Sequence, residues 1–276
     1  MKLATIRRGG STCAVRVDGG KYTVIPGYDS VSDLLAHGSL DDAANATGEE
    51  GDFASADLAP VLPSPSKVIC VGINYRSHIE EMGHQTPEYP ALFVKFAESL
   101  IGANDDLEIP PETDRFDYEG ELTVVIGKKI RRATAAEAEA AIAGYTVAND
   151  GSLRDWQYRS SQWIQGKVWE GTTPIGPVIV TPDEFPADAR IVTTLDGEVM
   201  QDAPVNDLLF GPVALVQYIS TMVTLNPGDI ILTGTPGGVG QARQPSVYVT
   251  PGKTVTVAID GIGMLNNKAV AEQVAQ

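Results

Sequence analysis

Cysteine and histidine are scarce, because the 276 residues include only two cysteines and three histidines. Cys13 and Cys70 lie far apart, so neither a disulfide framework nor a thiolate metal site can be built within one chain, and we expect both to be small core residues. Long apolar runs are missing too. No stretch approaches the roughly 18 apolar residues of a membrane-spanning helix, and no apolar stretch follows the basic residues near the start as it would in a signal peptide. We therefore expect a cytoplasmic protein with no membrane partner.

Positive charge is also in short supply. Lys and Arg total 20 against 36 Asp and Glu, which gives a formal net charge of -16 at pH 7. A protein that neutralises phosphates would lean the other way, so nucleic acid is excluded as an expected partner. The rest is ordinary: 43% hydrophobic, 20% charged and 7% aromatic residues form the composition of a folded globular protein, which excludes global disorder.

The clearest boundary along the chain is a proline-rich stretch. Three prolines between residues 59 and 66 prevent any regular element from continuing, so we interpret this stretch as a linker. Two strand-like pieces precede it, at 12–17 and 22–25, joined by a turn with two glycines. We therefore predict a small, mostly β N-terminal domain over residues 1–62 and a catalytic domain over residues 63–276.

After the linker, the pattern predicts many strands with a few helices placed irregularly between them. Thr134 and Glu137 form the signature of a capping box, which predicts a helix running to Ala143 and ended by Gly144. Asp196-Gly197, between two strand-like runs, predicts a hairpin. Strands that do not alternate regularly with helices indicate an α+β fold in which antiparallel sheets pack on each other.

A glycine-rich run at 233–240 has the look of a phosphate-binding loop. However, Gly238 and Gly240 lead to Arg243 and not to a third glycine, and Pro245 argues against the helix that would hold a pyrophosphate. We interpret the run as a tight turn that shapes the wall of a pocket.

Acidic residues gather where a buried strand begins. Glu119 and Glu121 are two apart, so on a strand both carboxylates point to one face, and Asp117 lies on the same side. The apolar run at 122–126 indicates that these acids lead into a buried sheet, where unpaired like charges are costly. Asp150 closes another strand-like segment. Carboxylates without histidine or cysteine suit a hard ion such as magnesium or manganese, and a solvated strand edge is the alternative.

Two further positions could carry acid-base or electrostatic chemistry. On a helix, His78 and Glu81 would share a face, so the glutamate could orient the imidazole and raise its basicity. A structural or exposed histidine is the alternative. A partly enclosed Lys167 could supply positive charge to a developing oxyanion, whereas a solvated lysine is the default.

Five motifs follow one another along the chain, namely VGINYRSHIEEM at 71–82, YEGELTVVIGK at 118–128, GYTVANDGSLRDWQ at 144–157, PIGP at 174–177 and LTGTPGGVG at 232–240. On these motifs the chain resembles the fumarylacetoacetate hydrolase family, and more narrowly its acylpyruvate hydrolase-like members. The resemblance covers roughly residues 60–265. It implies a mixed β-sandwich roll with a small N-terminal domain, assembled as a homodimer.

The resemblance also implies a role for particular residues. Magnesium or manganese would be bound by Glu119, Glu121 and Asp150. His78 with Glu81 would activate water. The remaining implied residues face the substrate: Lys167, Gln157 and Thr235, the last contacting a bound carboxylate. A distal carboxylate on the substrate would favour a positive partner, for which we name Arg76, with Arg159 and Arg243 as alternatives.

The activity that the resemblance implies is metal-dependent hydrolysis of the bond between carbons 3 and 4 of acylpyruvates, which are 2,4-dioxo acids. Water attacks the 4-oxo carbon, Lys167 stabilises the alkoxide, and pyruvate leaves as an enolate with a carboxylic acid as second product. Our first choice of substrate is fumarylpyruvate, which would place the enzyme in aromatic catabolism.

Other activities use the same metal and enolate chemistry. Oxaloacetate decarboxylation needs no activated water, and isomerisation or decarboxylation of hydroxymuconates is a further enzymatic alternative. A non-catalytic, metal-stabilised binding protein would keep the fold, but a structural ion would not need the His78 and Glu81 pair.

Overall fold

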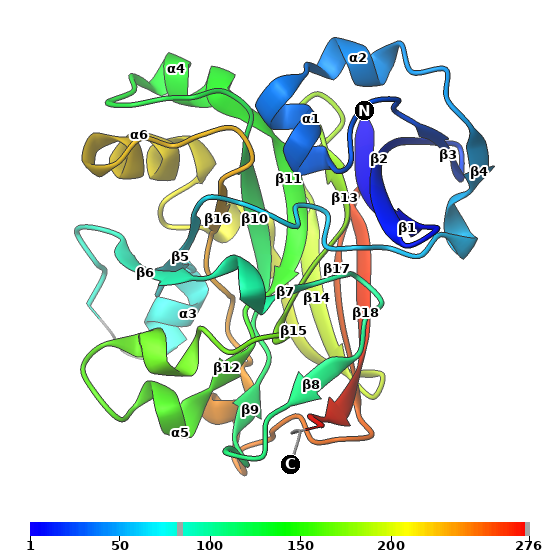
Figure 1. Cartoon of the computed structure of the whole chain (residues 1–276). Helices are drawn as coiled ribbons and strands as arrows, with labels where there is room; N and C mark the ends of the chain where they lie inside the picture. Colours follow the sequence, from blue (N-terminus) through cyan, green and yellow to red (C-terminus); the bar gives the residue numbers. More distant parts are fainter. Residues whose placement is uncertain (82–84, 274–276) are drawn as a thin grey trace.

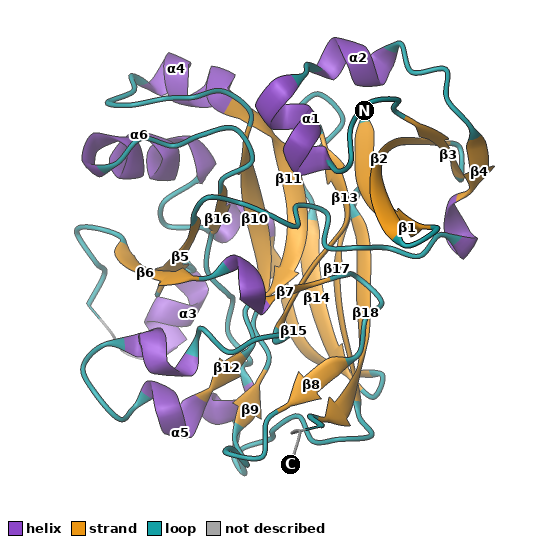
Figure 2. Ribbon diagram, in the orientation of Figure 1, coloured by secondary structure: helices purple, strands orange, loops and turns teal. Residues whose placement is uncertain are grey.

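The computed structural model describes residues 1–81 and 85–273, and Figures 1 and 2 show how its elements are arranged. Its helices are α1 (Val31–His37), α2 (Leu40–Ala44), α3 (Arg76–Glu81), α4 (Ala135–Ala141), α5 (Arg154–Gln157), α6 (Pro212–Met222) and the short 3-10 helices η1 (Phe53–Ser55), η2 (Ala97–Ser99), η3 (Trp163–Gly166), η4 (Val205–Asp207) and η5 (Gly240–Ala242). Its strands are β1 (Lys2–Arg8), β2 (Ser11–Asp18), β3 (Lys21–Val24), β4 (Glu50–Asp52), β5 (Val68–Gly72), β6 (Ala91–Lys95), β7 (Leu100–Ile101), β8 (Leu107–Ile109), β9 (Phe116–Asp117), β10 (Gly120–Ile126), β11 (Ile142–Asn149), β12 (Ser152–Leu153), β13 (Thr173–Val180), β14 (Arg190–Leu195), β15 (Glu198–Pro204), β16 (Ile230–Leu232), β17 (Thr254–Ile259) and β18 (Gly263–Ala271).

Two sheets form the body of the molecule. The larger, mixed sheet has the order β4-β3-β2-β1-β13-β11-β10-β16-β5-β6, with β7 beside β13, and the second has the order β15-β14-β17-β18-β8. Leu122 and Val147 of the larger sheet pack with Val257 and Leu265 of the second sheet in one hydrophobic core. The predicted α+β fold with packed sheets is confirmed, and helices lie at the edges and on the outer face (Figure 2).

Strand β10 is buried along its whole length, because both of its faces are covered. Leu122 and Val124 share one face of β10; Leu122 packs in the core between the sheets and Val124 packs with residues of α4 and α6. Val125, on the opposite face, packs in a separate cluster with Val68 and Ile230. Apolar residues on both faces give the continuous run that the sequence shows.

The N-terminal strands curl beside α1 and α2 at one end of the molecule (Figure 1). Strand β1 pairs with β13, with Lys2 opposite Val180, so hydrogen bonds join these strands to the larger sheet. The division of the chain after residue 62 into two domains stays a prediction.

Two local predictions have clear outcomes. The hairpin is confirmed, with positive φ angles of 50° at Asp196 and 82° at Gly197 between β14 and β15. The capping box at Thr134 is confirmed, but the predicted helix end is wrong: α4 stops at Ala141 and β11 starts at Ile142. Strand pairing overrides helix propensity here, and Gly144 is required because a Cβ on it would lie 2.3 Å from the carbonyl oxygen of Val180 on β13.

None of the helices in residues 1–81 and 85–273 combines the length and the hydrophobicity that crossing a bilayer requires.

Candidate active site

Three carboxylates meet where β10 begins and β11 ends. These strands pair antiparallel, with Gly120 opposite Asn149, so the start of one lies beside the end of the other. Glu119 immediately precedes β10, Glu121 lies within it, and Asp150 immediately follows β11. All three are buried, and one oxygen atom from each lies within 4.8 Å of those of the others. The structure thus brings together the three acids that the sequence singled out, and their role as metal ligands stays a prediction.

Buried cations surround these carboxylates. The Nζ atom of Lys167 lies 2.8 Å from Glu119 Oε2 and 2.7 Å from Asp150 Oδ2. The Nζ atom of Lys95 lies 2.8 Å from Asp150 Oδ1 and donates a second bond of 3.1 Å to the carbonyl of Gly151. Lys95 and Lys167 expose 0% and 2% of their side chains, so neither is a solvated lysine.

Arg154, at the start of α5, joins two acids of the β9–β10 segment. Its guanidinium contacts Asp117 Oδ2 at 2.8 Å and Glu119 Oε1 at 2.7 Å. We refer to the buried charged residues gathered here as the charged floor, which consists of Lys95, Glu119, Glu121, Asp150, Arg154 and Lys167.

The pKa shifts show that nearby positive charge does not compensate the carboxylates of the floor equally. Burial alone would raise the pKa of Asp150, but Lys167 and Lys95 outweigh it and hold that pKa below its ordinary value. Glu121 behaves in the opposite way: burial raises its pKa well above the ordinary value, and the negative charges of Asp150 and Glu119 add to the increase. Glu121 is therefore the carboxylate that lacks a compensating charge.

The contacts of Glu121 show what it lacks. Its Oε2 accepts a hydrogen bond of 2.7 Å from the backbone N–H of Gly234, and none of the ion pairs among the described residues includes it. A cation between the three carboxylates would supply the missing charge. The donor set is carboxylate oxygen alone, which suits magnesium or manganese, so the residues present fit the divalent metal that the family resemblance implies.

Asp117 has a different role from the three acids. Its carboxylate accepts hydrogen bonds from the backbone N–H groups of Gly240 and Gln241, at 2.7 and 2.9 Å, besides its ion pair with Arg154. It therefore ties the end of the glycine-rich turn to the charged floor, and it is separate from the carboxylates that could hold a metal.

A cavity of about 480 Å³ opens above the floor, and Glu119, Glu121, Arg154 and Lys167 line it. Figure 1 shows the edge strand β6 together with α3 and α5 away from the N-terminal strands. We refer to its apolar lining as the apolar wall, which consists of Val71, Ile73, Phe93, Trp163, Val239 and Ala242. The cavity lining thus combines charged and apolar side chains.

Gln157 and Thr235, the predicted substrate contacts, both line this cavity. Gln157 accepts a bond of 2.8 Å from Arg154 through Oε1. Thr235 Oγ1 accepts from Gln201 Nε2 at 2.7 Å and donates to the carbonyl of Gly120 at 3.0 Å. The glycine-rich run therefore forms a wall of the pocket, as predicted, and the contacts with substrate stay predictions.

The segment that carries His78 and Glu81 starts at the edge of the cavity. Their backbone belongs to α3, but both side chains lie outside the described residues. Ile73, just before α3, has a φ of 56°, a conformation that β-branched residues rarely adopt. The side chain of Asn74 binds backbone groups of Phe210 and Thr233, which anchors this turn.

Arg76 is placed differently from Lys167 and Gln157. Its guanidinium donates to the carbonyl of Leu208 at 2.6 Å, and it is not among the residues that line the cavity. The alternatives also have protein partners: Arg159 lies 3.4 Å from the ring centre of Trp156, and Arg243 donates to the carbonyl of Met200 at 2.8 Å. The role of Arg76 stays a prediction.

Sequence reasoning missed Lys95 and gave Arg154 no role. Phe93 and Lys95 are two apart on β6 and so face the same side, toward the cavity and the floor. A lysine that closes an otherwise apolar strand was the available signal.

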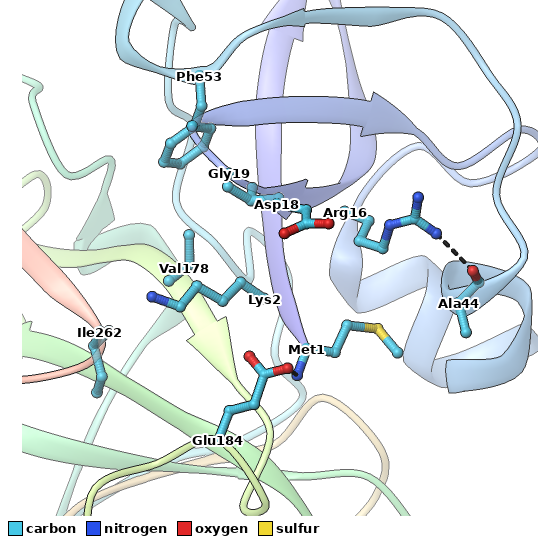
Figure 3. Close-up of a pocket in the computed structure, with 12 residues that line it drawn as sticks. Met1, Lys2, Arg16, Asp18, Gly19, Ala44, Phe53, Val178, Glu184 and Ile262 are labelled. Carbon is cyan, nitrogen blue, oxygen red and sulfur yellow. Dashed lines mark hydrogen bonds and ion pairs between the residues drawn. The ribbon is translucent and has the colours of Figure 1, made fainter.

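Another cavity, of about 520 Å³, lies beside β1 and β2 (Figure 3). There the backbone nitrogen of Met1 lies 2.6 Å from Glu184 Oε1, and Arg16 donates to the carbonyl of Ala44 at 2.6 Å. Within residues 1–81 and 85–273, the only group of three or more potential metal ligands is the one at Glu119, Glu121 and Asp150. The cavity above the floor is therefore the candidate active site.

Comparisons with known proteins identify relatives of the chain. The sequence model described as fumarylacetoacetate (FAA) hydrolase C-terminal matches residues 67–270. The mitochondrial oxaloacetate tautomerase Fahd2a of Rattus norvegicus is 43% identical over 216 residues, which are 77% of this chain and 69% of that protein.

Two solved structures cover 99% of this chain and 100% of their own. They are a 5-carboxymethyl-2-hydroxymuconate delta-isomerase from Mycobacterium smegmatis, with 36% identity and a TM-score of 0.83, and a fumarylacetoacetate hydrolase from Exiguobacterium antarcticum, with 34% identity and a TM-score of 0.88. The match of the family model over most of the chain, supported by these identities, shows that the chain belongs to the fumarylacetoacetate hydrolase family.

Proposed function

We propose that the chain is an enzyme that moves a proton between carbon 3 and the 2-oxo oxygen of a 2-oxo acid, and so interconverts its keto and enol forms. Oxaloacetate is the first candidate substrate. The observation that carries the proposal is the group of three buried carboxylates and two buried lysines beside a cavity of about 480 Å³. Relatives in Rattus norvegicus and Homo sapiens that are 43% identical bear the name oxaloacetate tautomerase, which supports the choice.

Glu119, Glu121 and Asp150 would hold magnesium or manganese, and the bound ion would act as a Lewis acid toward the 2-oxo group. The residues of the chain supply the rest. Asp150 and Glu119 outweigh the effect of burial and raise the pKa of Lys167, so it remains an ammonium group and keeps positive charge beside the developing enolate.

We assign the proton transfer to residues of α3. His78, oriented by Glu81, takes the proton from carbon 3 and returns it to the 2-oxo oxygen, so the imidazole is regenerated and the substrate keeps its charge and composition. Gln157 and Thr235, which line the cavity, orient the substrate carboxylate.

Hydrolysis of acylpyruvates is the second candidate, and the sequence motif that carries His78 and Glu81, whose backbone forms α3, supports it. In that reaction His78 deprotonates water, the water attacks the 4-oxo carbon, and Lys167 stabilises the alkoxide. Cleavage consumes one water and yields pyruvate and a carboxylic acid, which is fumarate when the substrate is fumarylpyruvate. Oxaloacetate decarboxylation and hydroxymuconate isomerisation are further possibilities that the same assay separates.

In the deciding experiment, the protein is incubated with oxaloacetate, fumarylpyruvate or acetylpyruvate in the presence of magnesium or manganese. The assay is repeated after EDTA treatment. Enol decay is followed by ultraviolet absorbance and products by mass spectrometry. Metal-dependent interconversion of oxaloacetate without loss of mass supports tautomerisation. Pyruvate with fumarate or acetate supports hydrolysis, and pyruvate with carbon dioxide supports decarboxylation.

The variant His78→Ala sharpens the result, because proton transfer and hydrolysis should both collapse whereas metal-driven decarboxylation should survive. If the metal binds but none of these acids reacts, the chain is a metal-stabilised binding protein.

The homodimer and the cytoplasmic location also stay predictions. The relative in Rattus norvegicus is named as mitochondrial. Sedimentation of the metal-loaded protein at micromolar concentration tests the dimer, and a monomer would contradict it.

A further inference from the structure

We propose that the apolar wall is a subsite for an uncharged, flat substrate tail, so that the cavity prefers a 2-oxo acid with one carboxylate and an aryl tail over oxaloacetate, which remains the first candidate only for the keto–enol reaction itself. This inference rests on the proposed function, because it concerns the substrate of the same cavity. It separates the reaction, which the floor performs, from the choice of substrate, which the wall makes.

The wall starts directly beside the floor. Phe93 lies on the same face of β6 as Lys95, and the Nζ atom of Lys167 is 4.9 Å from the centre of the Phe93 ring. The rings of Phe93 and Trp163 are 5.6 Å apart and meet edge to face at 75°. A substrate whose carboxylate head is held at the floor therefore extends along two aromatic rings.

Trp163 is held in place by a glycine. A Cβ added to Gly72, at the end of β5, would lie 2.3 Å from Cζ3 of the Trp163 indole. The indole therefore rests on bare backbone, which fixes its position as a wall of the cavity, and any side chain at position 72 would displace it.

Charge balance also favours one carboxylate. Asp117, together with the three acids of the floor, contributes four negative charges, and Lys95, Arg154 and Lys167 contribute three positive charges. A divalent cation changes this excess of one negative charge into an excess of one positive charge. One substrate carboxylate then makes the buried region neutral, and a second would leave an unbalanced negative charge.

The described part of the cavity lining offers a second carboxylate neutral donors, such as Gln157 and Gln241, but no uncommitted cation. Its cations are Arg154 and Lys167, and both already contact carboxylates at 2.7 to 2.8 Å. The size fits a longer substrate: about 480 Å³ lies within the roughly 300 to 1,000 Å³ of pockets for drug-sized ligands. Phenylpyruvate, with one carboxylate and an aromatic tail, is a suitable probe, and oxaloacetate is its dicarboxylate counterpart.

The test compares kcat/KM for keto–enol interconversion of phenylpyruvate and of oxaloacetate by the magnesium-loaded protein. We expect phenylpyruvate to be preferred by about tenfold or more, since differences of this size arise from apolar pockets. In Trp163→Ala, kcat/KM for phenylpyruvate should fall by about tenfold or more and that for oxaloacetate by less than about threefold. Trp169→Phe is the matched control, because Trp169 packs on Trp156 and does not line this cavity, and it should change neither value.

Two further variants keep the test decisive if Trp163→Ala does not fold. Gly72→Ala should displace the indole, and Phe93→Leu should remove the edge-to-face contact, and each should lower the preference for phenylpyruvate. A wild-type preference for oxaloacetate, or equal losses for both acids in these variants, would overturn the subsite.

Binding separates this inference from the proposed function. If neither acid is interconverted, the proposed function fails, and calorimetric titration of the magnesium-loaded protein then decides about the subsite. Tighter binding of phenylpyruvate than of oxaloacetate, weakened by Trp163→Ala but not by Trp169→Phe, supports the subsite. Equal binding of the two acids, or no effect of Trp163→Ala, rejects it.

Discussion

The charged floor and the apolar wall line the same cavity but are held together in different ways. At the floor, Lys95, Lys167 and Arg154 each contact carboxylate oxygens at 2.7 to 2.8 Å, and hydrogen-bonded ion pairs of this kind fix directions as well as distances. At the wall, Phe93 and Trp163 meet edge to face through apolar surface, without hydrogen bonds or ion pairs between them. We therefore expect substitutions at the floor to abolish the reaction. Substitutions at the wall should change the shape of the cavity while the reaction continues.

The largest effect is expected at the floor. In Glu121→Gln, the metal-dependent activity should fall by about a thousandfold or more, because loss of a carboxylate ligand removes several kcal/mol of stabilisation of the developing charge. Initial rates with saturating magnesium measure this loss. The exposed Glu139→Gln on α4 is the control and should keep full activity. Activity within tenfold of wild type in Glu121→Gln would show that the floor is as tolerant as the wall.

Lys95 provides the next test, because it belongs to the floor but does not line the cavity. Lys95→Met should destabilise the protein by about 3 to 5 kcal/mol, since it leaves Asp150 buried with one counter-charge fewer. Urea denaturation measures the free energy of unfolding, with the exposed Lys128→Met as control. A loss below about 1 kcal/mol would mean that Lys95 contributes no more than a surface charge.

Metal and pH should act together on Glu121. Its pKa is raised in the folded protein, so without metal its contribution to stability is complete below the ordinary pKa and is lost as pH rises through the raised value. A divalent cation favours the ionised form and removes that loss.

The stabilisation by magnesium should therefore grow as pH rises above the ordinary pKa of a glutamate, reaching roughly 2.7 kcal/mol at a hundredfold excess over its dissociation constant. Thermal unfolding with and without magnesium measures the difference, and Glu121→Gln should abolish its pH dependence. A difference that stays constant as pH rises would contradict the assignment.

The smallest effect is expected at Thr235, in the turn between floor and wall. Thr235→Val keeps the shape but removes the bonds with Gln201 and Gly120, which should cost about 1 kcal/mol of stability. If the hydroxyl also orients a substrate carboxylate, KM should rise by up to about tenfold while kcat stays near wild type. Steady-state kinetics distinguishes the two contributions, and the exposed Thr250→Val serves as control.

The sequence was informative wherever the signal is local. The period of two along a strand placed Glu119 and Glu121 on one face, and the turn at Asp196-Gly197 needed only residues that tolerate positive φ. Such features depend on neighbours in the sequence, so a single chain is enough to reveal them.

The missing parts of the site depend on contacts between distant segments. Lys95 and its partner Asp150 are 55 positions apart, and Lys167 and Glu119 are 48 apart. Lys95 ends β6, the last strand in the order of the larger sheet, and Lys167 follows η3, so no local pattern specifies either contact. The helix end at Ala143 was misjudged for the same reason, since pairing of β11 decides where α4 stops.

Strand β10 has a kinetic consequence. It is buried along its length between β11 and β16, so its amide hydrogens should exchange with solvent only when the whole molecule unfolds. Two of the three carboxylates stand on or next to this strand, and the third follows its neighbour. The carboxylate site should therefore stay intact during every partial unfolding of the protein. Thermal inactivation should then coincide with global unfolding. A heated sample should contain fully active and fully inactive molecules but no partly active ones.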